Sequence, residues 1–213
     1  MSLKGGSAPA RDCPACPRLV TFRQEWRARE PDWHNAPVPS FGDPSARLLI
    51  VGLAPGLRGA NATGRPFTGD YAGDLLYQTL QDFGFAHGTY AERADDGLTL
   101  QDCRITNAVR CVPPENKPTG AEIATCRRYL SATMAEMPQL RIILALGRIA
   151  HDSVLRTLEV TPSHYPFRHG GVHHVAGKTL ISSYHCSRYN TNTGRLTEAM
   201  FHDVFREIRR VLG

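Results

Sequence analysis

The sequence predicts an α/β fold, a three-layer αβα sandwich around a short, mainly parallel four-stranded sheet. Four short segments, at 48–51, 103–109, 140–146 and 179–183, have the length and composition of buried strands. Helical patterns separate these segments along the chain. Strands that alternate with helices form a parallel sheet covered by helices on both faces. We therefore place the four segments in the middle layer.

The helices follow from apolar spacing and from capping signals. Helical patterns cover residues 18–30, 74–83, 121–137, 147–158 and 196–212. Thr119 and Glu122 form a capping-box pattern, which fixes the start of the third helix. The stretch 161–177 carries four histidines, and we interpret it as a solvated loop because no acidic or cysteine partner accompanies them.

The bulk properties indicate one domain with a buried core. We expect a flexible lead-in over residues 1–12 and a single domain over residues 13–213. No apolar run approaches ~20 residues and no secretory signal is evident, so we expect no membrane partner and a cytoplasmic location. In that reducing compartment the six cysteines are not expected to form disulfides. The net charge of +5 is compatible with nucleic acid binding. We also expect a monomer.

A long glycine-rich loop follows the strand predicted at 48–51. It begins with Gly52, Leu53, Ala54, Pro55 and Gly56, and then carries Asn61, Thr63, Arg65, Phe67, Thr68 and Asp70. Ligands bind beyond the carboxyl ends of strands in open α/β sheets, and glycine lets the backbone approach them closely. We therefore expect a binding site here rather than a plain connection. Asp70 also suits the N-cap of the helix that follows.

A second polar loop, at 185–194, follows the strand predicted at 179–183. It reads HCSRYNTNTG and is bordered by Arg195. In a parallel sheet this loop leaves by the same edge as the first, so the two can face each other across one crevice. A histidine at the end of a strand is often structural, but the pairing of the two loops favours a functional role for His185.

Four cysteines are candidate metal ligands. Cys13 and Cys16 form a tight CPAC pair, whereas Cys111 and Cys126 form a looser one. Zinc usually has a tight pair in both halves of its site, and an iron–sulfur cluster tolerates wider spacing. Scattered, partly buried thiols are the alternative. Cys103 and Cys186 lie outside the pattern.

Three motifs resemble those of the uracil-DNA glycosylase superfamily, and most closely its family 5, the iron–sulfur type. They are GLAPG with GANATGRPFTGDYAGDLLY, then TNAVRCVPPENKPT, then YHCSRYNTNTGR. The resemblance covers nearly the whole chain from Cys13 onward. It implies an enzyme that flips uracil, or another deaminated base such as hypoxanthine or xanthine, out of DNA and hydrolyses its N-glycosidic bond. It also implies a 4Fe–4S cluster on Cys13, Cys16, Cys111 and Cys126.

The resemblance implies roles for individual residues as well. Asp70, His185 and Asn116 match catalytic positions, and Leu53 replaces the polar residue that other families have after the strand glycine. Phe67 matches the residue that stacks on the flipped base, and Asn107 matches a reader of its edge; Asn107 and Asn116 cannot be ranked. The substrate-binding set is Gly52, Leu53, Ala54, Pro55, Gly56, Phe67 and Asn107. The DNA-binding set is Ser187, Arg188, Tyr189, Asn190 and Arg195, with Tyr189 as the wedge.

One departure from the family pattern and two rival functions stand beside this interpretation. The second motif usually reads HPS, whereas this chain has Cys186 between His185 and Ser187, which leaves the aim of His185 open. An iron–sulfur redox protein would explain the four cysteines but neither polar loop. A catalytically inert nucleic-acid-binding module would agree with Leu53, since a usual catalytic position is then blank. Release of a base from DNA distinguishes the enzyme from both.

Overall fold

The computed structural model describes residues 6–213. The first part of the expected lead-in, residues 1–5, lies outside the described residues. Within residues 6–12, the Ser7 amide donates to Glu136 Oε1 over 3.2 Å, and Asp12 pairs with Arg27. No helix among the described residues is long and apolar enough to cross a membrane.

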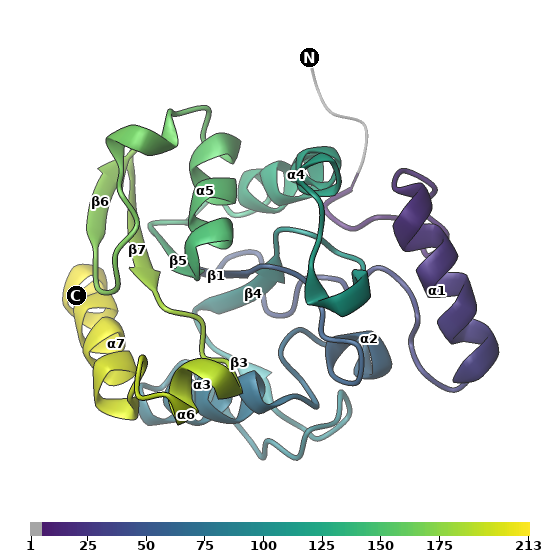
Figure 1. Cartoon of the computed structure of the whole chain (residues 1–213). Coiled ribbons are helices and arrows are strands. Elements are labelled where there is room, and N and C mark those ends of the chain that lie inside the picture. The colour runs from purple at the N-terminus through teal and green to yellow at the C-terminus, as the bar shows by residue number, and fades with distance from the viewer. Residues whose placement is uncertain (1–5) are drawn as a thin grey trace.

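The middle layer is a five-stranded sheet in the order β4-β1-β5-β7-β6. Four strands are parallel: β1 (Leu48–Gly52), β4 (Cys103–Asn107), β5 (Ile142–Leu146) and β7 (Lys178–Ser183). The fifth strand, β6 (Val172–Val175), runs antiparallel to β7 at the edge (Figure 1). The predicted fold class is confirmed, but the predicted number of four strands is wrong.

The extra strand comes from the histidine-rich stretch. Ala176 and Gly177 both have positive φ, 48° and 72°, so they form a tight turn that folds β6 back onto β7. His173 and His174 lie within β6 and are paired with Leu180 and Thr179. The interpretation of 161–177 as a solvated loop is therefore wrong for this part, because an edge strand accepts polar residues on its open face.

Helices cover both faces of the sheet (Figure 1). Their bounds are α1 (Pro17–Arg29), α2 (Ala60–Thr63), α3 (Tyr71–Asp82), α4 (Gly120–Ala135), α5 (Arg148–Thr157), α6 (Arg188–Asn192) and α7 (Glu198–Leu212). Two 3₁₀ turns, η1 (Pro114–Asn116) and η2 (Pro162–His164), and a small antiparallel pair, β2 (Ala86–His87) with β3 (Thr99–Leu100), complete the fold. The Thr119–Glu122 capping box of α4 is present as predicted.

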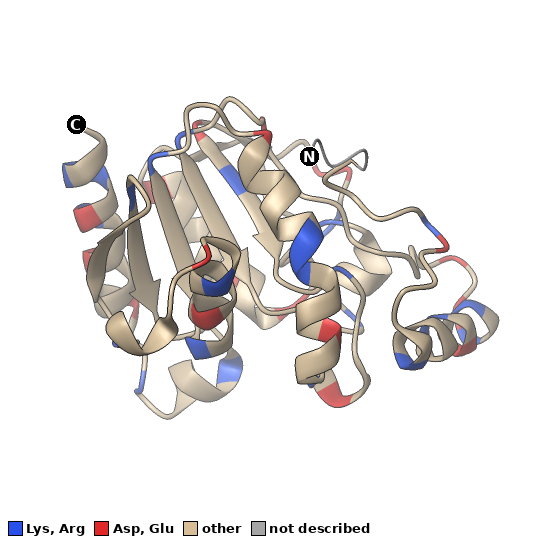
Figure 2. Cartoon of the chain, turned by 90° about the horizontal axis from the view of Figure 1, so that it is seen from above, with Lys and Arg blue, Asp and Glu red and all other residues tan. Residues whose placement is uncertain are grey.

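The core consists of two apolar layers, one on each face of the sheet. On one face, residues of α3 and α7 such as Leu76, Phe201 and Phe205 pack against β1 and β4. On the other, residues of α4 and α5 such as Leu130 and Val154 pack against β1 and β5. Seen from above in Figure 2, the charged residues are carried mainly by helices and loops. The carboxyl ends of β1, β4, β5 and β7 therefore meet at one edge, which both polar loops leave.

Candidate active site

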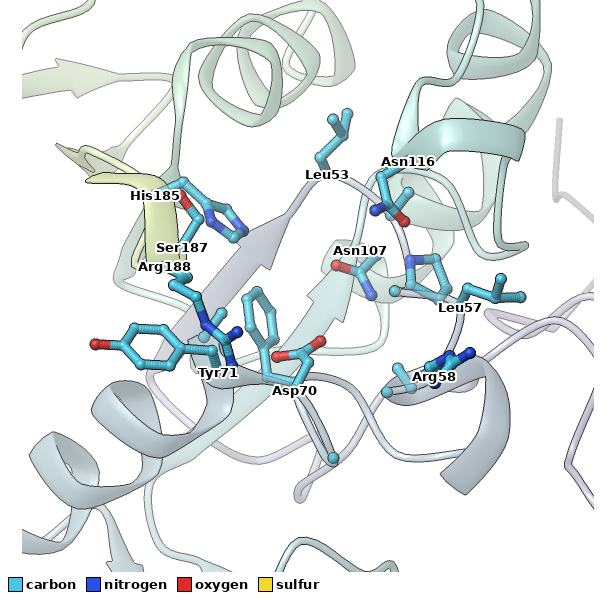
Figure 3. Close-up of a pocket in the computed structure, with 18 residues that line it drawn as sticks. Leu53, Leu57, Arg58, Asp70, Tyr71, Asn107, Asn116, His185, Ser187 and Arg188 are labelled. Carbon is cyan, nitrogen blue, oxygen red and sulfur yellow. The ribbon is translucent and has the colours of Figure 1, made fainter. Parts of the chain in front are cut away.

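A cavity of about 630 Å³ opens at this edge of the sheet (Figure 3). Its walls come from the loop after β1, the start of α3, the end of β4, the η1 turn and the loop after β7. Of the residues predicted from sequence, eleven line it: Leu53, Ala54, Pro55, Gly56, Phe67, Asp70, Asn107, Asn116, His185, Ser187 and Arg188. Gly52, Tyr189, Asn190 and Arg195 do not.

Gly52 does not line the cavity, but its lack of a side chain leaves room for two residues that do, Phe67 and Asn107. A Cβ atom at Gly52 would lie 2.5 Å from the Phe67 ring and 2.5 Å from Asn107 Oδ1. Any larger residue would therefore displace both side chains. Asn107, at the end of β4, is only 3% exposed, and its Oδ1 has no hydrogen-bond partner among residues 6–213. A buried amide oxygen without a partner is costly unless a ligand supplies a donor.

Phe67 is held in an unusual backbone conformation. Its φ is 53°, a region that bulky residues rarely adopt. Its carbonyl oxygen accepts from Tyr90 Oη over 3.3 Å. On the other side of the loop, the buried Arg65 guanidinium binds both carboxylate oxygens of Asp96, at 2.8 and 2.7 Å, and donates to Thr68 Oγ1. These contacts fix the loop so that the Phe67 ring forms a wall of the cavity.

Asp70 has two roles in the structure at once. Its Oδ1 accepts from the Gly73 amide over 3.1 Å, so the residue is the N-cap of α3, as one interpretation of the sequence held. Its Oδ2 lies on the side of Gly56 and Gly59, where an added Cβ would come within 3.1 and 2.7 Å of it. Figure 3 shows the carboxylate pointing into the cavity. Burial raises the pKa of Asp70 above its usual value.

His185 follows the end of β7 and lines the same cavity as Asp70 (Figure 3). Its ring lies 5.9 Å from that of Phe67, centroid to centroid, with 30° between the planes. Burial lowers the pKa of His185 to about 4, so the imidazole is neutral at pH 7. Asn190 Nδ2 donates to the His185 carbonyl oxygen over 2.8 Å, which ties the loop to α6.

Cys186 stands where the resembling motif usually has proline, and its side chain packs inside the fold. It is fully buried, and its Sγ donates to the Ala72 carbonyl oxygen over 3.4 Å in the first turn of α3. Burial raises the pKa of its thiol, so the residue is neither exposed nor ionised enough to act as a nucleophile. Cys186 instead joins the loop after β7 to the helix that Asp70 caps.

The rim of the cavity is polar and exposed. Asn116 ends the η1 turn with a φ of 56°, directly after Glu115 with a φ of 54°. On the opposite side, the Arg188 guanidinium lies 5.1 Å from the centre of the Tyr71 ring. The adjacent Tyr189, in α6, is 72% exposed. An aromatic side chain so exposed next to a pocket is a candidate contact for a ligand or partner.

Sequence reasoning missed seven residues that line the cavity. They are Leu57, Arg58, Gly59, Ala60, Gly69, Tyr71 and Ala72. All lie within the loop that the sequence singled out or in the first turn after it. Residues 57–58 separate two motif segments, and only the fold shows that Gly59, the first residue of the second segment, lies against the Asp70 carboxylate.

The four candidate metal ligands also come together, in a cavity separate from this one. Cys13, Cys16, Cys111 and Cys126 line one small cavity beside α1 and α4, together with Leu19 and Val109. Arg23 Nη1 donates to Cys111 Sγ over 3.6 Å, and the Arg110 amide donates to Cys126 Sγ over 3.3 Å. Among residues 6–213, no set of three or more such side chains is arranged to hold a single metal ion.

The donor set fits a larger group better than it fits one ion. Four thiols facing one apolar space, with N–H donors directed at two of the sulfurs, provide the ligands and the outer hydrogen bonds that iron–sulfur clusters have. Each iron of a cubane takes one thiolate, so the sulfurs stand further apart than around a single ion.

Fold and site together define a class: an α/β protein with a cavity at the carboxyl edge of a parallel sheet, lined by an aromatic ring, a buried amide, a carboxylate and an imidazole. Residues 39–209 match the uracil DNA glycosylase superfamily. The chain is 46% identical to the type-5 uracil-DNA glycosylase of Thermus thermophilus over 94% of each chain. The corresponding protein of Mycobacterium leprae is 45% identical over 94% of this chain and 92% of its own.

A more distant type-5 uracil-DNA glycosylase, from Pyrobaculum aerophilum, is 40% identical over 92% of this chain and 87% of its own length. The type-4 uracil-DNA glycosylase of Archaeoglobus fulgidus is 32% identical over only 65% of this chain. The chain therefore belongs to the uracil DNA glycosylase superfamily and, within it, to the type-5 group.

Proposed function

We propose that this protein is a monofunctional DNA glycosylase that flips uracil out of DNA and hydrolyses its N-glycosidic bond, leaving an abasic site. The observation that carries the proposal is the convergence of Phe67, Asn107, Asp70 and His185 on one cavity. The type-5 relatives, named uracil-DNA glycosylases, support it. A base inside a duplex cannot be reached by these groups, so it has to leave the stack.

In this mechanism the flipped base stacks on Phe67. The Asn107 amide offers an acceptor for uracil N3–H and a donor for O4, which would satisfy its unpartnered oxygen. Asn116, on the rim, provides a second amide for the base or for the attacking water. The loop 52–56 closes around the base, where Pro55 and Gly56 bring backbone close to it.

Cleavage of the N-glycosidic bond leaves positive charge on the sugar and negative charge on the base. Asp70 and His185 suit these two charges. As the bond from C1′ to the base lengthens, the sugar becomes oxocarbenium-like and the base becomes an anion. The Asp70 carboxylate stabilises the positive sugar and orients the water that attacks C1′. The neutral imidazole of His185 donates a hydrogen bond to the O2 atom of the departing base. The Leu53 side chain cannot accept a hydrogen bond from the attacking water, whereas Oδ2 of Asp70 can.

We propose that the α6 segment contacts the DNA around the flipped nucleotide. Ser187 and Arg188 line the cavity and carry a hydroxyl and a guanidinium, donors that suit phosphate oxygens, whereas the Asn190 amide binds the His185 carbonyl oxygen and holds the loop in place. Arg195 follows on the far side of α6. Tyr189 follows Arg188 in the sequence and is 72% exposed, and we assign it the space that the flipped nucleotide vacates.

Replacement of Tyr189 by alanine is expected to weaken activity on duplex more than on single strands. The ring fills the hole only where a base pair has been opened, and base–aromatic stacking contributes ~1–3 kcal/mol per base. The measurement is kcat/KM for uracil release from matched duplex and single-stranded oligonucleotides. Thr193→Ala, on an exposed residue that ends α6, is the control. Equal losses on both substrates would contradict a wedge.

We further propose that Cys13, Cys16, Cys111 and Cys126 bind one 4Fe–4S cluster with a structural role. When bound, the cluster would cross-link the segment before α1 to the loop after β4 and to α4. Burial raises the pKa of the Cys111 thiol to about 12, so without a metal this thiol stays protonated. Arg23 contributes a positive charge and a hydrogen bond next to a thiolate ligand.

Anaerobically purified protein is expected to contain about four iron and four sulfide per chain. Cys111→Ser should lower the iron content and the melting temperature together, because the link between the two segments is lost. Cys103→Ser, which alters a buried cysteine of β4 outside the set, is the control and should keep its iron. Stoichiometric zinc in place of iron would refute the cluster.

The base range extends in this proposal to hypoxanthine and xanthine. A cavity of about 630 Å³ exceeds what a single pyrimidine ring fills, and its wall at Leu53 and Ala54 is apolar. Incubation with oligonucleotides that each carry one deaminated base, followed by alkaline cleavage, tests both the function and the range. Absence of any cleavage with uracil would refute the proposed function.

We also propose that the enzyme works as a monomer on chromosomal DNA in the cytoplasm, in one domain over residues 13–213. Among residues 6–213, the only large hydrophobic side chains that are exposed are Ile149 and Tyr189. Such scattered residues do not make the apolar patch that a stable dimer would bury.

A further inference from the structure

A second groove lies beside the proposed active site. It has a volume of about 290 Å³ and borders the first cavity at His185, which lines both. The first cavity is at the carboxyl ends of β4 and β1, and the second is at the carboxyl ends of β5 and β7, next along the same edge. The mechanism above gives roles to His185, Asn190 and Arg195, but it uses none of the other five residues that line this groove, Gly147, Arg148, Phe167, Arg168 and Tyr184.

Three arginines, Arg148, Arg168 and Arg195, line the groove. Within residues 6–213, none of their guanidinium groups has a carboxylate within 4.0 Å, and no hydrogen bond to another protein group is formed by them. Some arginines elsewhere are neutralised, such as Arg18 by Glu122 and Arg65 by Asp96. Like charges that converge on one groove without a counter-charge repel one another, and a bound anion would remove that repulsion.

Aromatic rings hold two of these guanidinium groups by their faces. The Arg148 guanidinium carbon lies 5.3 Å from the centre of Phe167, and that of Arg195 lies 4.6 Å from the centre of Tyr184. His169 stacks on Tyr184 at 5.1 Å, and its Nδ1 accepts from the Tyr184 amide. Stacking occupies the face of a guanidinium and leaves its N–H edge free, which is the edge that binds phosphate oxygens.

Part of the groove is built by the segment that was not expected to be structured. Phe167 and Arg168 lie in the connection between η2 and β6, and the pairing of β6 with β7 holds that connection against the sheet. The Gly170 amide donates to the Ser182 carbonyl oxygen over 2.8 Å, and the Ser182 amide donates to that of Gly171 over 3.0 Å. The edge strand thus positions a ring and a cation beside His185.

We propose that this groove binds a backbone phosphate of the DNA outside the flipped nucleotide. The proposal rests on the proposed function for its choice of anion. The first cavity receives the flipped nucleotide, and the short helix α6 with the exposed Tyr189 connects the two sites, since Arg188 lines one and Arg195 lines the other. DNA that lies along this edge with Tyr189 inserted brings its backbone over the second groove.

The test compares Arg168→Gln, Arg195→Gln and the double variant with wild type in binding to an undamaged 20-base-pair duplex over a range of salt. Loss of one phosphate contact is expected to make the slope of log K against log[salt] less negative by about 1. The double variant should bind about tenfold more weakly near 0.1 M salt. Arg156→Gln, which removes an exposed charge from α5 outside both cavities, is the matched control and should keep the wild-type slope.

Two further comparisons decide the interpretation. A uracil-containing trinucleotide reaches only the first cavity, so its affinity should be the same for wild type and for Arg168→Gln. A double variant with the slope of Arg156→Gln, or an Arg168→Gln defect as large on the trinucleotide as on the duplex, would overturn the proposal. Binding to undamaged duplex needs no base release, so a wild type with the expected slopes but no uracil release would refute the proposed function alone.

Discussion

Asp70→Asn is expected to slow single-turnover uracil release by ~100-fold or more. The carboxylate is proposed to stabilise positive charge at C1′, and asparagine keeps the shape while removing the charge. An oxocarbenium ion captures even neutral water readily, so the loss comes from electrostatics more than from a missing base. Rapid-quench measurement of abasic product with excess enzyme gives the rate of the chemical step.

The same substitution is expected to leave the fold intact. Asparagine is as good an N-cap as aspartate, so the bond from the Gly73 amide can persist. Because burial raises the folded-state pKa of Asp70, the charged form costs stability at pH values above that pKa, and removing the charge relieves this cost. We therefore expect a melting temperature at pH 7 within about 3 °C of wild type or above it.

Asp74→Asn is the matched control for this prediction. Asp74 lies one turn further along α3, is exposed, and does not line the cavity. It loses the same charge from the same helix and should release uracil at the wild-type rate. A normal rate for Asp70→Asn would remove Asp70 from the mechanism and direct attention to Asn107, Asn116 and His185.

The fold was largely predictable because strand and helix periods are local signals. The segment predicted as a strand at 103–109 ends earlier, at Asn107, because the Ala108 and Val109 amides turn to the Gly52 and Leu53 carbonyl oxygens. The strand β6 could not be predicted, since its two histidines are not apolar and its pairing depends on the turn into β7. Edge strands carry weaker patterns than buried ones.

The candidate site was predictable where a loop has an unusual composition, and less so where contacts cross the fold. Asp70 had two competing interpretations from sequence, N-cap and cavity carboxylate, and the structure combines them through its two oxygens. The close approach of Gly59 to Asp70 depends on how the loop folds, and the dependence of Phe67 on Tyr90 and Asp96 involves two residues outside the motifs. The groove lined by Arg148, Arg168 and Arg195 is formed by three segments that lie apart in the sequence, and no residue spacing indicates that they meet.

His185→Ala is expected to lower the single-turnover rate of uracil release by ~100-fold. The neutral ring is proposed to donate a hydrogen bond to the base oxygen that becomes negative as the bond breaks. Burial lowers the pKa of His185 to about 4, so the ring is uncharged at higher pH and the wild-type rate should be flat through pH 6.5, where a free histidine titrates. His185→Gln, which keeps an N–H donor, should recover part of the loss.

Comparing the release of two different bases tests whether His185 stabilises the departing base. 5-Fluorouracil leaves as a more stable anion than uracil and needs less help, so His185→Ala should slow its release much less than that of uracil. Asp70→Asn acts on the sugar and should slow both alike. At acid pH, wild type and His185→Ala should both lose rate as Asp70 is protonated, below a pKa raised by burial. Asp70→Asn should lack that acid limb, because it has no carboxylate to protonate. Equal slowing of both bases in His185→Ala would show that the ring shapes the pocket and does not stabilise the leaving base.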